Sequence, residues 1–476
     1  MFNTRAYATR KLSTLGAKYL PFADVASEDV PLSRLLRLSL FQVTVGMALV
    51  LLVGTLNRVM IVEMQVPATL VALMLALPLV FAPFRALIGY KSDVHVSALG
   101  LRRIPYIWKG TLCQFGGFAI MPFALLVLSG FGESADLPRW IGLSAAALSF
   151  LLVGAGVHIV QTVGLALATD LVHEDDQPRV VGLMYVMLLL GMVVSALVYG
   201  ALLEHYTAGR LVQIIQGSAV VSVAINLFAM WKQEARNRDR AQQMKAARPL
   251  HFREAWGRLS RSDQMMRLMV VVCVGTFGFG MADVLLEPYG GQALGMSVAD
   301  TTKLTALFAT GTLIGFAAAS KLLSGKTAPA NLAFAGAAIG IPGFAAIIFA
   351  STGGGVSSFL LGTFLVGLGA GLFGHATLTA TMRAAPKDQI GLALGTWGAA
   401  QATAAGVGVA LAGIVRDVVV GLQAAGGNAA PAPYNTVFSI EVVSLLAALV
   451  ILWPMAARLT TRIGHNNPNA KQVEGS

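Results

Sequence analysis

The chain has 476 residues, of which 56% are hydrophobic and 12% are charged. Soluble domains carry about 25% charged residues, so this composition excludes a disordered protein and a typical soluble enzyme, and it indicates a membrane protein. A net charge of +11 would suggest nucleic acid as the partner of a soluble protein. Membrane orientation explains that charge more simply, and we predict no nucleic-acid partner. The two cysteines, Cys113 and Cys273, allow neither a disulfide framework nor a zinc site.

Residues 1–37 form a basic segment without the apolar core and cleavage site of a secretory signal, so we place it at the cytoplasmic membrane surface. Apolar segments then recur at the length that crosses a bilayer, about 20 residues. They span about 38–62, 68–90, 106–129, 140–168, 180–203, 211–231, 267–288, 300–323, 328–350, 357–381, 390–420 and 436–457. We therefore predict an all-α integral membrane protein with twelve transmembrane helices.

A basic stretch at 232–266 separates the first six apolar segments from the last six. The predicted parts are an N-terminal six-helix bundle over 38–231, a cytoplasmic loop over 232–266, a C-terminal six-helix bundle over 267–457 and a cytoplasmic tail over 458–476. Lys and Arg collect on the cytoplasmic side of membrane proteins. If both termini are cytoplasmic, the inner loops hold most of the basic residues, and the outer loops hold only a few. Those few are Arg58, Arg139, Arg210 and Lys303.

The two halves also resemble each other. The stretch Gly54 to Glu63 aligns with Gly278 to Glu287, and the fourth and tenth apolar segments each carry a single histidine shortly after a pair of glycines. A parallel repeat of six plus six helices is typical of the major facilitator architecture, whose binding site lies where the halves meet. We therefore predict the major facilitator fold with both termini cytoplasmic.

The loop after the second apolar segment contains Gly89, Asp93, Arg102 and Arg103. This order resembles the major facilitator signature, although the spacing between Asp93 and Gly100 is longer than usual. A carboxylate at a helix end can pair with the arginines in only one state of a transporter, which would make these residues a conformational latch. The alternative interpretation is a basic inner loop that only sets orientation.

Charged residues inside a bilayer cost about 2.5–3.5 kcal/mol each on insertion scales, so they are candidates for function. Glu63, Asp283 and Glu287 lie in or near apolar segments, and they are either proton sites or acidic caps that reach water. Arg58 precedes Glu63 by five residues and could pair with it, although the spacing is poor for an α-helix.

Two of the seven histidines, His158 and His375, lie deep in apolar segments. Each either donates a hydrogen bond to a neighbouring helix or ligates a metal axially through a neutral imidazole nitrogen. Nearby glycines would leave a flat space for a planar ring. These glycines are Gly154, Gly156 and Gly164 for His158, and Gly369, Gly371 and Gly374 for His375. The glycines at 353–355 are not followed by the Lys of a phosphate-binding loop, which argues against an ATP-driven pump.

Several segments resemble one known family. They are Pro21–Asp24, Leu32–Arg37, the stretch from Leu56 to Glu63 that contains Asn57 and Arg58, and the stretch from Asp283 to Gly291 that contains Glu287, Pro288 and Tyr289. The chain resembles the bacteriochlorophyll-delivery (PucC/LhaA) family of the major facilitator superfamily over nearly its whole length. Within that family it is most similar to the LhaA branch, which serves assembly of the core antenna, light-harvesting complex 1 (LH1), rather than the PucC branch, which serves the peripheral antenna.

The resemblance implies a non-enzymatic assembly factor of light-harvesting complexes in the inner, intracytoplasmic photosynthetic membrane. Its cargo would be bacteriochlorophyll a, whose magnesium takes an axial ligand, and no metal would be bound directly by the protein. Candidate pigment ligands are His158, His375, Gln161 and Glu63. Implied partners are antenna polypeptides, the reaction-centre core, the bacteriochlorophyll synthase, the membrane insertase and membrane lipids.

A second hypothesis is a proton-coupled secondary transporter of a small solute, which would use Asp283 or the pair Glu63 and Glu287. Such a transporter needs a polar cavity at mid-membrane, whereas a pigment carrier needs a flat apolar cleft. The apolar segments contain few polar residues, which favours the pigment carrier.

Overall fold

A computed structural model of the chain describes residues 30–80, 88, 91–92, 101–130, 134, 136–172, 176–234, 261–323, 327–385, 390–424 and 431–465. Every regular element in these ranges is helical. This agrees with the high apolar content of the chain, because a backbone surrounded by lipid must form its hydrogen bonds internally, as a helix does. Of the predicted functional residues, Gly89 and Asp93 lie outside the described ranges, as do most of the basic loop and the end of the tail.

The chain divides into two units by its internal contacts. Unit 1 comprises Met1–Leu52 and Phe81–Arg248, and unit 2 comprises Val53–Val80 and Pro249–Ser476. Val53–Val80 thus groups with the second half of the chain, whereas the sequence suggested a boundary only at 232–266. The predicted pair of six-helix bundles stays a prediction.

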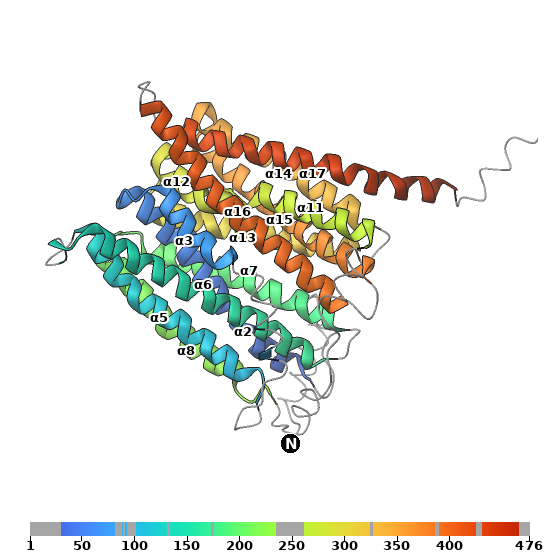
Figure 1. Cartoon of the computed structure of the whole chain (residues 1–476), viewed down its shortest axis with the longest axis horizontal. Helices are drawn as coiled ribbons and strands as arrows, with labels where there is room; N and C mark the ends of the chain where they lie inside the picture. Colours follow the sequence, from blue (N-terminus) through green and yellow to red (C-terminus); the bar gives the residue numbers. More distant parts are fainter. Residues whose placement is uncertain are drawn as a thin grey trace, which may run out of the picture. The chain divides into compact units, whose positions relative to one another are not determined.

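Unit 1 contains α2, α5, α6, α7 and α8 (Figure 1). Their bounds are Leu32–Leu49, Ile104–Ser129, Arg139–Asp170, Gln177–Leu202 and Ala208–Met230. Helix α5 packs along α6 and α8, and α2 packs on α6, α7 and α8. The close α5–α6 contact depends on small residues: a Cβ added at Gly156 would lie 2.5 Å from the carbonyl oxygen of Gly110. Without a hydrophobic driving force between helices in lipid, such close backbone approach is a main source of attraction.

Unit 2 contains η3, α3 and the elements from α11 to α17. Their bounds are Val59–Glu63, Ala68–Val80, Asp263–Gly280 (α11), Ala282–Leu294 (α12), Val298–Leu323 (α13), Pro329–Phe349 (α14), Ala350–Gly354 (η6), Gly355–Ala384 (α15), Ile390–Ala424 (α16) and Ala432–His465 (α17). A π-helical stretch, η2 (Val50–Leu56), continues α2 and crosses the division between the units. Helix α15 packs on α13 and α14, and α3 packs on α16.

Ten helical stretches in the described ranges are long and apolar enough to cross a membrane. One of them, Pro329–Ala384, contains both α14 and α15, which correspond to two of the predicted segments. A shorter apolar helix covers Ala68–Leu79, and the rest of the predicted segment 68–90 is largely outside the described ranges. The protein is therefore a multi-pass membrane protein. The count of twelve helices and the cytoplasmic position of both termini stay predictions.

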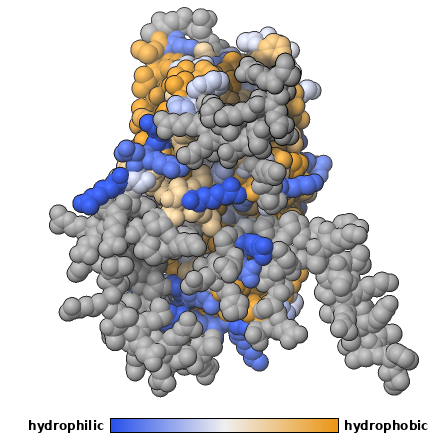
Figure 2. All heavy atoms as spheres, turned by 90° about the vertical axis from the view of Figure 1, so that its right-hand side faces the viewer, coloured by the Kyte–Doolittle hydropathy of each residue, from blue (hydrophilic) through white to orange (hydrophobic). Residues whose placement is uncertain are grey.

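The apolar surface is large, as expected for a protein whose solvent is lipid. On the face in Figure 2, apolar residues cover much of the described surface. Helix α17 exposes 72% of Val450 and 64% of Trp453, and α8 exposes 62% of Val220. Large exposed apolar surfaces are rare on soluble monomers.

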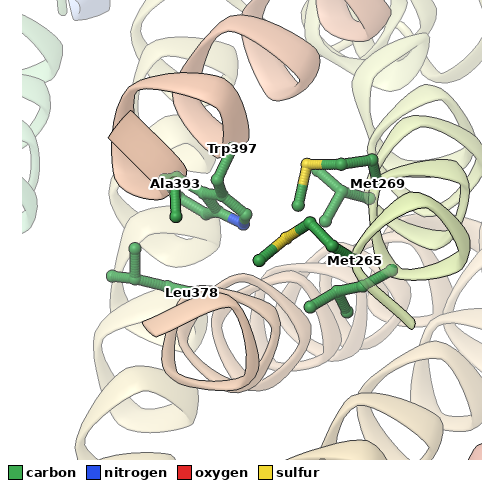
Figure 3. Close-up of a cluster of buried hydrophobic side chains, with 7 residues drawn as sticks. Met265, Met269, Leu378, Ala393 and Trp397 are labelled. Atoms are coloured by element: carbon green, nitrogen blue, oxygen red, sulfur yellow. The ribbon is translucent and has the colours of Figure 1, made fainter. Parts of the chain in front are cut away.

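Unit 2 contains a buried cluster of apolar side chains from α11, α15 and α16, in which Met265 and Met269 face Leu378, Ala393 and Trp397 (Figure 3). The indole nitrogen of Trp397 donates a hydrogen bond of 3.3 Å to Thr377 Oγ1 on α15. The thioethers fill the irregular space around the indole ring. This cluster fixes α16 against α11 and α15.

Candidate functional site

The helix that begins at Leu32 changes to π-helical geometry near its end, over η2 and η3, and Asn57 and Arg58 lie between these two stretches. In a π-helix the backbone bonds run from residue i to residue i+5, so side chains five apart become neighbours. Arg58 Nη1 accordingly donates a hydrogen bond to Glu63 Oε1, and the two form an ion pair. The predicted pairing is confirmed, and the π-helical backbone explains the five-residue spacing.

Two of the four segments that carry the family resemblance, 56–63 and 283–291, meet within unit 2. Asn57 Nδ2 donates to the carbonyl oxygens of Val53 (3.0 Å) and Val284 (2.8 Å). Arg58 Nη2 donates to the carbonyl oxygen of Met296 at 3.1 Å. Both side chains are buried, with Arg58 only 3% exposed. A buried amide and a buried guanidinium therefore join the end of the first membrane helix to both ends of α12.

Glu287 is enclosed at the same junction, with 3% exposure. Thr305 Oγ1 donates a hydrogen bond to Glu287 Oε1, while Glu287 Oε2 is buried and has no hydrogen-bond partner among the described residues. Next to it, the hydroxyl groups of Thr55 and Thr302 share a hydrogen bond of 3.2 Å. The interpretation of Glu287 as an acidic cap that reaches water is wrong, because the side chain is buried and its carboxyl is held by Thr305 on α13. Glu63, with a side chain 38% exposed, does reach the surface.

A second buried carboxyl, Glu441 on α17, lies at the start of α12. Glu441 Oε1 accepts a hydrogen bond of 2.5 Å from the backbone nitrogen of Ala282, and its side chain is fully buried. Asp283 is close enough for the two carboxyl groups to interact electrostatically. Sequence reasoning missed Glu441, although a lone acid in an apolar segment is the same signal that identified Asp283.

Tyr289 is a packing residue. Its hydroxyl donates to the carbonyl oxygen of Ile347 on α14 at 3.0 Å, and its ring contacts Phe359, Tyr434 and Phe438 edge-on. Pro288 is buried within α12 beside it. These residues explain the resemblance segment structurally, because they fix α12 among α14, α15 and α17.

A polar network that sequence reasoning also missed ties α12, α16 and α17 together. Gln292 Oε1 accepts from Arg416 Nη2 (2.8 Å) and from the Tyr434 hydroxyl (2.6 Å). Asp417 Oδ1 accepts from Arg416 Nη1, and Asp417 Oδ2 accepts from the backbone nitrogen of Thr69 at the start of α3. The network anchors α3 to α16 by a charge at a helix N-terminus.

In unit 1 the predicted latch arginines have acidic partners that the sequence did not reveal. Arg103 Nε donates to Asp170 Oδ2 at 3.0 Å, Arg103 Nη1 donates to Ser92 Oγ at 2.8 Å, and Arg102 Nη2 reaches the same carboxylate of Asp170 at 3.3 Å. Glu234 accepts hydrogen bonds from the backbone nitrogens of Arg102, Arg103 and Ile104. The arginine pair is thus fixed between the ends of α6 and α8. The latch itself stays a prediction, because Gly89 and Asp93 are not in the described ranges.

The four candidate pigment ligands are divided between the units. His158 and Gln161 lie on α6 in unit 1 and are partly exposed, whereas Glu63 and His375 belong to unit 2. The His375 ring lies 4.1 Å from that of Phe316, centroid to centroid, and its Nδ1 is buried without a hydrogen-bond partner in the part of the chain that the structure describes. Glu63 is already engaged by Arg58.

The expectation that glycines leave flat spaces beside these histidines is wrong at four positions. The space beside Gly156 is occupied by the backbone of Gly110, and the space beside Gly164 by the Phe41 ring. The spaces beside Gly369 and Gly371 are occupied by the backbones of α14 and α13, respectively. Helix contact uses these glycines, because backbones approach most closely where no Cβ intervenes. Gly374, directly before His375, does have open space: nothing lies within 4 Å of an added Cβ.

The fold is shared with solved transporters. A bacterial homologue of the human lysosomal transporter Spinster matches with a TM-score of 0.62 at 16% identity, over 89% of this chain and 95% of that one. The nucleoside transporter NupG matches with a TM-score of 0.61 at 14% identity, over 89% of this chain and 98% of that one. The chain is therefore a multi-pass membrane protein with a fold of the major facilitator type.

The family model for "PUCC protein" matches residues 55–459, and the chain belongs to this family. "Protein PucC" of Rhodobacter capsulatus is 67% identical over 95% of this chain and 99% of its own length. An "Uncharacterized protein in puhA-bchM intergenic region" of the same species is 46% identical, covering 94% of each chain. A more distant relative, the "Bacteriochlorophyll synthase 44.5 kDa chain" of that species, is 26% identical over 79% of this chain and 85% of its own.

Proposed function

We propose that this protein is a light-harvesting complex assembly factor, which binds bacteriochlorophyll a and delivers it to antenna polypeptides in the intracytoplasmic photosynthetic membrane. It acts by binding and handover rather than as an enzyme. Membership of the PUCC family supports a role in photosynthetic complex assembly, and a relative named as a bacteriochlorophyll synthase chain supports the pigment as cargo.

The observation that carries the pigment part of the proposal is the environment of His375. A buried imidazole nitrogen without a hydrogen-bond partner among the described residues is unusual, because buried polar atoms are nearly always paired. The ring has an aromatic neighbour, Phe316, and the adjacent Gly374 leaves open space. These residues fit a planar ring whose central magnesium takes an imidazole ligand. His375 is therefore our first candidate, ahead of His158 and Gln161, and Glu63 is the least suited since it pairs with Arg58.

The partners follow from the same proposal. They are the antenna polypeptides and, as suppliers and neighbours, the bacteriochlorophyll synthase, the membrane insertase and the reaction-centre core. The resemblance to the LhaA branch favours the core antenna, LH1. The 67% identity to a protein named PucC favours the PucC branch, and with it the peripheral antenna, as the alternative client.

The test is pigment retention by the protein purified gently from a phototrophic membrane. Replacing His375 with Phe should lower the bacteriochlorophyll absorbance per protein at least about five-fold, because the side chain that would bind the magnesium of the pigment is lost. His158→Phe tests the second candidate in the same way. His205, which is exposed after α7, provides the control His205→Phe, which should keep the parent ratio.

Two outcomes would count against this assignment. A parent protein that is colourless after antenna proteins are removed would exclude a stable pigment site. Full pigment in both His375→Phe and His158→Phe would exclude these histidines as ligands and leave pigment bound elsewhere. Size-exclusion profiles that match the parent show that the variants are folded.

A further inference from the structure

A groove of about 840 Å³ lies on unit 1, beside the start of α2 and the end of α8. Its lining comprises Ser33, Arg34, Leu36, Arg37, Leu40, Met187, Phe228 and Lys232. Three of these side chains are cationic and none is acidic, whereas four are apolar. The lining of the groove thus combines cationic side chains with apolar side chains.

The two arginines of the groove are held in place by the turn that follows α8. Arg37 Nη2 donates to the carbonyl oxygen of Trp231 at 2.8 Å, and Arg34 Nη2 donates to the carbonyl oxygen of Gln233 at 2.8 Å. Arg37 Nε is buried and has no hydrogen-bond partner within the described ranges. A buried guanidinium donor that lacks an acceptor is costly, so this position favours an incoming acceptor such as an anionic oxygen.

The apolar part of the groove continues along a face of α8. Phe228 is 59% exposed and Leu36 on α2 is 36% exposed. Val221 is 46% exposed and lies seven residues before Phe228, so both occupy one face of α8. Seven residues of helix cover about 10 Å, which is a track long enough for a substantial part of an acyl chain.

The neighbouring pocket gives a natural contrast. It has a volume of about 710 Å³, and its lining shares Arg34 and Lys232 with the groove but adds Glu234. It also contains Trp108 and Trp231, the second of which is 64% exposed. Exposed tryptophans are typical of the depth of lipid headgroups. The two tryptophans therefore place this end of unit 1 at a membrane interface, and the acid-free groove is its more electropositive part.

From these observations we infer that the groove is a binding site for an anionic phospholipid. The phosphate lies between Arg37 and Lys232, where the planar guanidinium and the ammonium both meet its oxygens, and one acyl chain follows Leu36, Phe228 and Val221. A soluble polyanion would use the charges but not the apolar track. A zwitterionic lipid would use the track but would bring its own cation toward Arg34. The inference does not depend on the proposed pigment function.

The test uses the whole protein, stripped of lipid in detergent and titrated with dioleoyl phosphatidylglycerol or dioleoyl phosphatidylcholine, with bound lipids counted by native mass spectrometry. The parent should retain phosphatidylglycerol at least about five-fold more tightly than phosphatidylcholine. The double variant Arg37→Gln/Lys232→Gln should lose that preference.

The matched control is Lys109→Gln/Arg179→Gln, which removes the same charge from unit 1 at positions outside the lining of the groove. It should keep the parent preference for phosphatidylglycerol. An equal loss of that preference in this control would mean that overall charge explains the effect, and it would contradict a binding site in the groove. No preference in the parent, or an unchanged preference in the groove variant, would overturn it as well. If the double variant fails to fold, the single variant Lys232→Gln replaces it, because it changes only an exposed side chain. This variant should weaken phosphatidylglycerol binding at least about two-fold. Unchanged binding in it contradicts the inference.

Discussion

At the scale of single residues, Gly54 illustrates how tightly the junction around Glu287 is enclosed. A Cβ added at position 54 would collide with the Glu287 carboxyl and would lie 3.0 Å from Thr305 Oγ1. The carboxyl cannot easily withdraw, because Thr305 holds it and the surrounding side chains are buried. Glycine is required here for close approach and not for backbone conformation, since Gly54 lies in a regular π-helical stretch.

We therefore expect Gly54→Ala to lower the free energy of unfolding by about 1–3 kcal/mol, the usual cost of overpacking. A thermal-stability assay in detergent measures the effect. Gly217→Ala on α8 is the matched control, because nothing lies within 4 Å of its added Cβ. Shortening the acid in Gly54→Ala/Glu287→Asp should recover part of the loss. If Gly54→Ala melts at the parent temperature, the enclosed carboxyl is not where the structure has it.

At the scale of elements, the start of α5 is held by a residue more than a hundred positions away. Glu234 Oε1 accepts from the backbone nitrogen of Arg102 at 2.8 Å, and Oε2 accepts from those of Arg103 (3.0 Å) and Ile104 (3.1 Å). A carboxylate here satisfies donors that no helical carbonyl can reach, and it complements the positive end of the helix dipole. The same acid lies near Arg102, so the two arginines depend on it for their position.

Replacing Glu234 with Gln should loosen the first turn of α5 by about 1–2 kcal/mol, because the amide keeps only one acceptor oxygen and loses the charge. Hydrogen exchange read by mass spectrometry should show faster exchange around Ile104 to Trp108 and little change at the other end of α5. Glu204→Gln changes an exposed acid after α7 and should leave exchange in α5 unaltered. Unchanged protection in the Glu234 variant would mean that the α5 start is stable without its cap.

At the scale of the whole molecule, sequence reasoning found the elements better than their junctions. Apolar length alone located most membrane helices, because lipid imposes a minimum helix length on any sequence. It could not find the π-helical stretches that bring Arg58 to Glu63, since no residue pattern marks them. It also missed Asp170, Glu234 and Glu441, whose partners lie far away in sequence. The glycines near His158 were misinterpreted because a glycine that packs a helix and one that leaves a space look the same in sequence.

The buried carboxyls of unit 2 allow the two functional hypotheses to be separated. A proton-coupled transporter would use Asp283, or the pair Glu63 and Glu287, as titrating groups, whereas a pigment carrier needs no titration of Asp283 beside Glu441. Asp283→Asn keeps the shape and removes the acid. Under the proposed function, membranes from this variant should carry the parent level of antenna absorbance, to within about two-fold. Vesicles containing the parent protein should show no proton-driven uptake of small solutes.

Glu287→Gln serves as the companion variant, because it removes a second acid while keeping a group that can accept from Thr305. Normal antenna absorbance in both variants would indicate that the acids are structural and that handover needs no proton movement. Proton-driven uptake by the parent that disappears in Asp283→Asn, together with loss of antenna absorbance, would instead make transport the physiological activity. The two readouts respond to different parts of the protein, since under the proposed function pigment retention would depend on His375, whereas uptake would depend on the acids of α12.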